Sequence, residues 1–154
     1  MDMYKFIVPF RMHNTGWGLV AICHLIGIQL GGWRLGFYIG VSLIASLLMH
    51  EVGHMLIAGV FRVPVTEFGL TLRGAYNRRA RARRRRDEIL ISTAGPLMNL
   101  FIAIPLLFLP HIGPQLALCN FVLCLGNLLP IPSSDGLRIL RTVWRPNHPN
   151  QLLA

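Results

Sequence analysis

Charged residues are scarce in this chain, and acidic residues are the scarcest. Only 14% of the 154 residues are charged, and six Asp or Glu stand against 15 Lys or Arg. Hydrophobic residues make up 53%, and the mean hydropathy is +0.52. Such a composition disfavours a soluble globular domain. We therefore expect a single membrane-embedded domain over residues 1–154, without a soluble appendage.

Paired cysteines and a secretory leader are also lacking. The three cysteines, Cys23, Cys119 and Cys124, lie in apolar segments without metal-ligand spacing, which predicts buried, reduced thiols. Residues 1–12 offer no basic start followed by an apolar core and a small-residue cleavage site. We therefore expect the N-terminus to be retained.

Apolar residues gather in stretches whose lengths can be compared with the ~17–25 residues that span a bilayer. The first stretch is short and flanked by glycine, so it could instead lie at the membrane interface. The overall pattern predicts an all-α polytopic membrane protein with about four transmembrane helices. The stretches are Trp17–Leu30, Leu35–Phe61, Ile89–Leu109 and Gln115–Ile131.

The basic residues predict an orientation. Lys5 and Arg11 precede the first stretch, residues 62–86 separate the second from the third, and Arg138, Arg141 and Arg145 follow the fourth. Only Arg34 falls on the opposite side. Because basic loops face the cytoplasm, we expect both termini and the active side there.

The densest basic run, Arg78–Arg86, raises the alternative of nucleic-acid binding, since clustered arginines neutralise phosphates. The run has no aromatic residues for base stacking, and it lies where a juxtamembrane anchor is expected. We expect a solvated cytoplasmic loop at residues 73–88 that contacts anionic lipid headgroups, and no nucleic-acid partner.

Residues 63–73 change period, because Phe68, Leu70 and Leu72 alternate with polar residues or glycine. This alternation predicts a strand, or a small membrane-associated hairpin, after the second helix. Two interpretations stay open. The strand has a free edge that binds an extended peptide, or it belongs to a structural hairpin that covers the domain.

The motif His50-Glu51-Val52-Gly53-His54 lies inside the second stretch. Residues four apart differ by about 40° around a helix, so the two imidazoles share a face. In such motifs the histidines bind zinc and the glutamate acts as a base. The alternative is a pair of core histidines without metal, which the cost of ionisable groups in a membrane disfavours.

A catalytic zinc usually takes a third protein ligand. The extended soluble pattern fails, because Ile57 and Val60 stand where it needs a glycine and a histidine. Asp135 is the best donor, since it follows a helix broken by Pro130 and Pro132 at the cytoplasmic end of the last stretch. The other acidic residues and histidines outside the motif are Asp2, Glu67, Asp87, Glu88, His13, His24, His111 and His148.

Three motifs together resemble the site-2 protease family of intramembrane zinc metalloproteases, and they occur in the family's order. They are His50–His54, the Ala-Gly-Pro-Leu-Met-Asn segment at residues 94–99, and Asn127–Gly136. The resemblance covers a core of about residues 35–140. Two departures are Ser133 and Ser134 before the aspartate and Leu137 after Gly136.

The resemblance implies one zinc ion held by His50, His54 and Asp135, with Glu51 acting in water activation. It also implies that Asn99 and Asn127 orient ligands, the oxyanion or the substrate. For both asparagines the alternative is a hydrogen bond between packed helices.

The function predicted is that of an intramembrane zinc-dependent endopeptidase, which cleaves a transmembrane segment of a membrane protein by activated water. Strand-like docking of the substrate on residues 67–72 would fit. The alternatives are a membrane metal-binding or transport protein and a catalytically inactive family member. A regulatory membrane partner is a further expectation, since no regulatory domain is recognisable.

Overall fold

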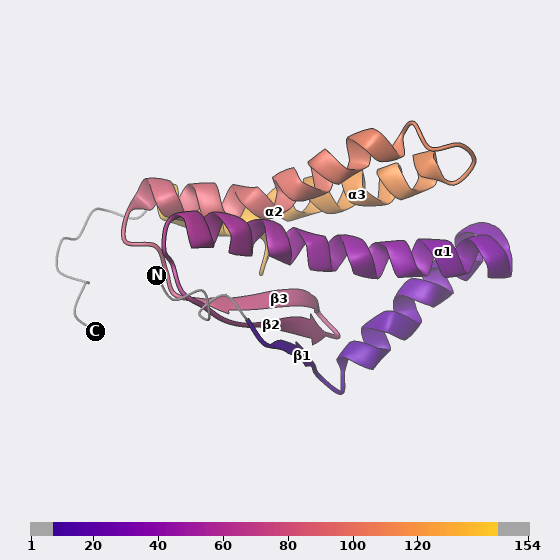
Figure 1. Ribbon diagram of the computed structural model, residues 1–154, viewed down its shortest axis with the longest axis horizontal. Coiled ribbons are helices and arrows are strands. Elements are labelled where there is room, and N and C mark those ends of the chain that lie inside the picture. The colour runs from indigo at the N-terminus through magenta and orange to yellow at the C-terminus, as the bar shows by residue number, and fades with distance from the viewer. Residues whose placement is uncertain (1–7, 145–154) are drawn as a thin grey trace.

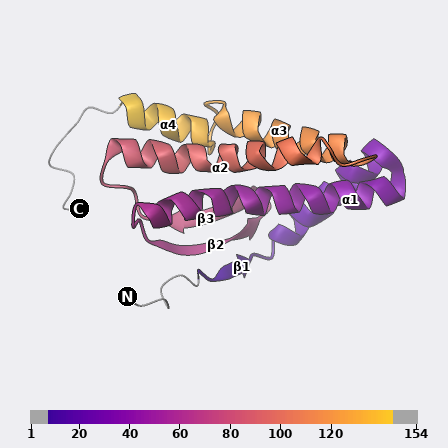
Figure 2. The same cartoon turned by 45° about the horizontal axis from the view of Figure 1, so that its top comes forward.

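The computed structural model describes residues 8–144. The helices lie side by side, and a small sheet lies along one face of α1 (Figures 1 and 2). The fold is therefore mostly helical, as expected, with three strands added. In chain order the elements are β1 (Phe10–Met12), α1 (Gly16–Val60), β2 (Val65–Thr71), β3 (Gly74–Arg79), α2 (Arg85–Leu106), α3 (Gly113–Leu128) and α4 (Asp135–Trp144).

Helix α1 consists of two arms joined by a sharp turn. The turn lies at Gly31 and Gly32, whose backbone angles are not helical, and Gly32 has a φ of 69° that favours glycine. The arms then pack closely, because a Cβ on Gly27 would lie 2.1 Å from the carbonyl oxygen of Gly36. The first two apolar stretches thus form one helical hairpin.

The four expected spans are not confirmed. Among the described residues, α1 and α2 are long and apolar enough to cross a membrane, whereas α3 has only 16 residues. Large apolar side chains nevertheless project outward, since Trp33, Phe101 and Phe108 are 74–82% exposed. An apolar surface of this kind suits lipid contact.

The sheet confirms the expected strand but corrects its role. β2 lies in the middle, parallel to β1 and antiparallel to β3, and Phe68 is paired on both sides. A free edge on β2, and substrate docking on residues 67–72, were therefore wrong. The structural hairpin was the right alternative, and the free edge beside α1 belongs to β3.

The loop expected at residues 73–88 is largely regular structure. β3 extends to Arg79, whose side chain is only 6% exposed and forms two contacts with Glu88, at 3.0 and 2.8 Å. Glu88 also accepts the backbone N–H of Ala82 at 2.8 Å. A buried guanidinium needs such a partner. The solvated-loop prediction was wrong for Arg79, while Arg81 and Arg83 are exposed as expected.

The chain breaks its last long helix where the prolines predicted. α3 ends at Leu128, and residues 129–134 are not helical. The hydroxyl oxygen of Ser134 then accepts the backbone N–H of Leu137 at 3.1 Å, which caps the start of α4. The sequence analysis did not foresee α4, whose first residue is Asp135.

The Arg79–Glu88 pair is expected to stabilise the junction between sheet and helices. Glu88→Gln should cost about 3 kcal/mol, because it leaves a buried guanidinium without its counter-charge. The measurement is the thermal unfolding of the detergent-purified protein by tryptophan fluorescence. Asp87→Asn, in the same helical turn, is the matched control. An equal melting temperature for both variants would contradict a stabilising role.

Candidate metal centre

The centre is built first on the second arm of α1. His50 and His54 lie one turn apart, and both are at most 4% exposed. Their Nε2 atoms are 3.1 Å apart, with the rings nearly perpendicular at 82°. The four-residue spacing thus places two imidazole nitrogens at one point inside the protein.

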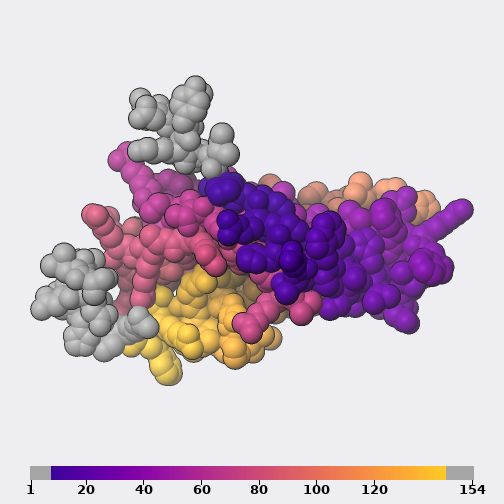
Figure 3. Space-filling model, turned by 90° about the horizontal axis from the view of Figure 1, so that it is seen from below, coloured from indigo at the N-terminus to yellow at the C-terminus, as the bar shows by residue number. Residues whose placement is uncertain are grey.

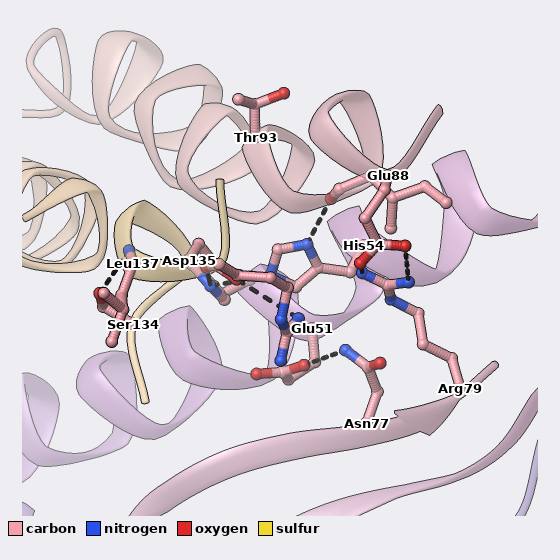
Figure 4. A network of polar contacts seen from close by, with 12 residues as sticks. Glu51, His54, Asn77, Arg79, Glu88, Thr93, Ser134, Asp135 and Leu137 are labelled. Atoms are coloured by element: carbon pink, nitrogen blue, oxygen red, sulfur yellow. Dashed lines mark hydrogen bonds and ion pairs between the residues drawn. The ribbon is translucent and has the colours of Figure 1, made fainter. Parts of the chain in front are cut away.

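Asp135 brings a carboxylate to the same point from α4 (Figure 4). Its Oδ2 atom lies 2.9 Å from Nε2 of His50 and 3.1 Å from Nε2 of His54. One ligand atom from each residue falls in a group no wider than 4.8 Å. The three residues therefore place one carboxylate oxygen between two imidazole nitrogens.

The other ring nitrogens are held by fixed acceptors. Nδ1 of His50 lies 2.6 Å from Oδ1 of Asn99, and Nδ1 of His54 lies 2.6 Å from the carbonyl oxygen of Ile91. The Asn99 amide cannot easily be reversed, because its Nδ2 donates to the carbonyl of Ser46 and to Oδ1 of Asn120. Each Nδ1 therefore donates, which leaves each Nε2 lone pair directed at the centre.

Gly95 on α2 leaves room at this centre. A Cβ at this position would lie 2.4 Å from Nε2 of His54 and 2.6 Å from Nε2 of His50. Two imidazole nitrogens and one carboxylate oxygen are the three protein ligands that a catalytic zinc site uses. The residues present therefore fit a zinc ion.

Glu51 lies beside the centre and is 8% exposed. Its carboxylate accepts a hydrogen bond from Nδ2 of Asn77 on β3 (Figure 4). Oδ1 of Asn77 is buried and has no hydrogen-bond partner among the described residues. The free-edge strand therefore reaches the centre with both an amide donor and an unused acceptor.

The two asparagines named from the sequence differ in position. Asn99 is fully buried and contacts His50, and it also bridges α1 and α3, so it has features of both alternatives. Asn127 donates to the carbonyl of Leu123 one turn earlier in α3, at 3.0 Å. No contact within the described part of the chain joins it to the histidines, and its role stays a prediction.

Sequence reasoning missed Asn77, Asn120 and the carbonyl of Ile91. Asn120 is fully buried, and its Nδ2 donates to the carbonyl of Leu116. An amide inside the last apolar stretch was a usable signal for Asn120. Asn77 stands beside the arginine run, and only the strand pairing shows that it faces α1.

Comparisons with known proteins agree with this geometry. A family model described as Peptidase family M50 matches residues 38–114, half of the chain, including the His50–His54 motif. YwhC of Bacillus subtilis, provisionally named a zinc metalloprotease, is 29% identical and covers 71% of this chain. Zinc metalloprotease MJ0392 of Methanocaldococcus jannaschii is 27% identical and covers 88%.

The fold also matches a solved structure, the site-2 protease from Methanocaldococcus jannaschii. The TM-score is 0.74 at 24% identity, over 93% of this chain and 69% of that one. The chain spans 70% of the length of YwhC and 42% of that of MJ0392. The chain therefore belongs to peptidase family M50, the zinc metalloprotease family of the site-2 proteases.

Proposed function

We propose that this membrane protein is an intramembrane endopeptidase that cleaves transmembrane segments of membrane protein substrates. The observation that carries the proposal is the convergence of His50, His54 and Asp135 inside helices whose outer surface is apolar. Ionisable residues buried in such helices are costly and mark functional sites. Membership of the family supports the proteolytic chemistry.

His50, His54 and Asp135 would hold one zinc ion through Nε2, Nε2 and Oδ2. Zinc bound there would polarise the scissile carbonyl and lower the pKa of a coordinated water to about 7. The chain's own part is to keep both imidazoles neutral and correctly turned. The Nδ1 contacts to Asn99 and Ile91 do this.

Glu51 moves the proton in the proposed reaction. Its carboxylate takes a proton from the attacking water and returns it to the nitrogen of the leaving amine. Asn77 holds the carboxylate through a neutral amide. Its unused Oδ1 can accept a backbone N–H of the substrate, which would place the cut bond beside Glu51.

Water and substrate would reach the centre along different chain segments. The non-helical residues 129–134 interrupt the apolar helices next to Asp135 and offer polar backbone groups for a water route. An extended substrate would pair with the free edge of β3, and not with β2 as the sequence suggested. Local unwinding of the substrate helix is needed for such pairing.

The orientation remains as the basic residues predict, with the active side toward the cytoplasm. The hairpin of α1 supports it, because Arg11 and Arg62 then flank the same end of the two arms. Lys5, Arg145 and both termini lie outside the described residues. The proposal also includes contacts of anionic lipid headgroups with Arg83–Arg86, and a regulatory membrane partner.

Replacing Glu51 by Gln tests the proteolytic function. The variant should retain stoichiometric zinc but lose at least about a hundredfold of the cleavage rate, because the proton acceptor is gone. The assay combines metal analysis with cleavage of a panel of single-span membrane proteins. Glu67→Gln, in the sheet, is the control. Cleavage that survives in Glu51→Gln would contradict the mechanism. Zinc without cleavage in the wild type would favour an inactive or metal-carrying protein.

Gly95→Ala tests the metal site without changing a ligand. The new methyl group would stand between the two Nε2 atoms, so bound zinc should fall to a small fraction of the wild-type content. Gly126→Ala is the matched control, since no heavy atom lies within 4 Å of a Cβ placed there. Both proteins are compared by zinc content and by melting temperature. Full zinc occupancy in Gly95→Ala would show that the metal binds at another place in the protein.

The two asparagines can be ranked by zinc affinity. Asn99→Ala should weaken zinc binding about 10- to 100-fold, the usual effect of removing a partner of a ligating histidine. Asn127→Ala should leave the affinity close to the wild-type value, because its amide bonds within α3. Competition with a zinc chelator measures both. Equal losses would show that Asn127 also supports the centre.

A further inference from the structure

A polar cavity of about 410 Å³ is lined in part by residues that contact Glu51 and Asp135. It is formed where β3, the start of α2 and α4 meet, and Figure 3 shows the chain segments around it on one face of the molecule. Of its lining residues, the proposed reaction uses Asn77 and gives the arginines no role. The lining residues that matter here are Asn77, Arg79, Arg81, Glu88, Arg138 and Arg141.

The cavity carries an excess of positive charge. Glu88 is the acidic residue among its described lining, and its carboxylate is already occupied by Arg79. Arg81 and Arg141 are exposed, and the side chain of Arg138 is 46% exposed. Arg138 and Arg141 stand three residues apart on α4 and so share a helix face. Arg79 and Glu88 thus neutralise each other, and the remaining arginines give the cavity its positive charge.

Two lining residues connect this cavity with the reaction site. Asn77 contacts the carboxylate of Glu51, and Nη1 of Arg138 lies 3.7 Å from Oδ1 of Asp135. An extended chain that pairs with β3 beside Glu51 would therefore send a nearby side chain toward the arginines. The cavity therefore lies next to the residues that would carry out the reaction.

We propose that this arginine cavity is a substrate subsite that binds an acidic side chain close to the scissile bond. The proposal rests on the proposed proteolytic function. Planar guanidinium groups pair well with a carboxylate, with two parallel hydrogen bonds, and such charged contacts are about twice as strong as neutral ones. A glutamate or aspartate at one position would select the substrate and fix its register.

A lipid phosphate has similar chemistry, but the geometry favours the peptide. Two of its lining residues, Asn77 and Arg138, contact Glu51 and Asp135, next to which the substrate backbone lies in the proposed reaction. The exposed arginines that suit headgroups, such as Arg83 and Arg84, line a different cavity, together with the residues that follow α1. The cavity beside the metal centre is therefore assigned to the substrate.

The test uses a single-span substrate with one glutamate at successive positions around the cut bond, each paired with a glutamine version. At one position the wild type should cleave the glutamate substrate about tenfold faster, which corresponds to about 1.4 kcal/mol. Arg141→Gln should remove this preference, and Arg141→Glu should shift it to lysine at the same position. Arg83→Gln, a surface arginine outside the cavity, should keep the preference. Equal rates at every position would overturn the subsite and leave the protease function standing.

Binding without cleavage separates the two proposals. Short capped fluorescent peptides, with glutamate or glutamine at the selected position, are titrated into Glu51→Gln protein in phosphatidylcholine nanodiscs. Tighter binding of the glutamate peptide that depends on Arg141 would support the subsite even if no substrate is cut. Adding phosphatidylglycerol to the nanodiscs tests whether a lipid phosphate occupies the cavity instead. Wild-type cleavage that depends on this lipid through Arg141, without any glutamate preference, would overturn the subsite in favour of a headgroup site.

Discussion

The architecture depends on bringing three electron-pair donors within 4.8 Å of one another inside an apolar helical body. Two nitrogens and a carboxylate that face each other repel unless a proton or a metal ion lies among them. The protein meets this constraint with fixed geometry. His50 and His54 are locked at their outer nitrogens, Gly95 leaves room at the inner ones, and the capped start of α4 delivers Asp135. The remaining elements hold these groups in place.

Much of this arrangement could be predicted from the sequence because its signals are local. The four-residue spacing of His50 and His54 fixes a shared helix face, and two prolines mark the end of α3 before Asp135. The alternation around Phe68 predicts β2 for the same reason, since side-chain period depends only on neighbouring residues. These features need no knowledge of distant contacts.

The predictions that were wrong concern features that depend on contacts between residues far apart in the sequence or in different elements. Arg79 reads as part of a solvated run, but Glu88, nine residues later, compensates its charge and lets it be buried. The local sequence predicts an edge strand at β2, but β1, which precedes α1 in the chain, pairs with it. The span count is not confirmed, because α3 has only 16 residues and the first two stretches form one hairpin within α1. Hydropathy does not show which segments will cover one another.

The two buried acids near the centre illustrate how surroundings divide their roles. Asp135 lies beside two imidazoles, and the guanidinium of Arg138 favours the anionic form of its carboxylate, as the proposed ligand role requires. The described partner of Glu51 is a neutral amide from the sheet, which orients the carboxylate without supplying a counter-charge. A carboxylate in that setting can accept and release a proton during the reaction. The strand that provides this amide also lines the arginine cavity, so the proposed base and the proposed substrate subsite both depend on the same short hairpin.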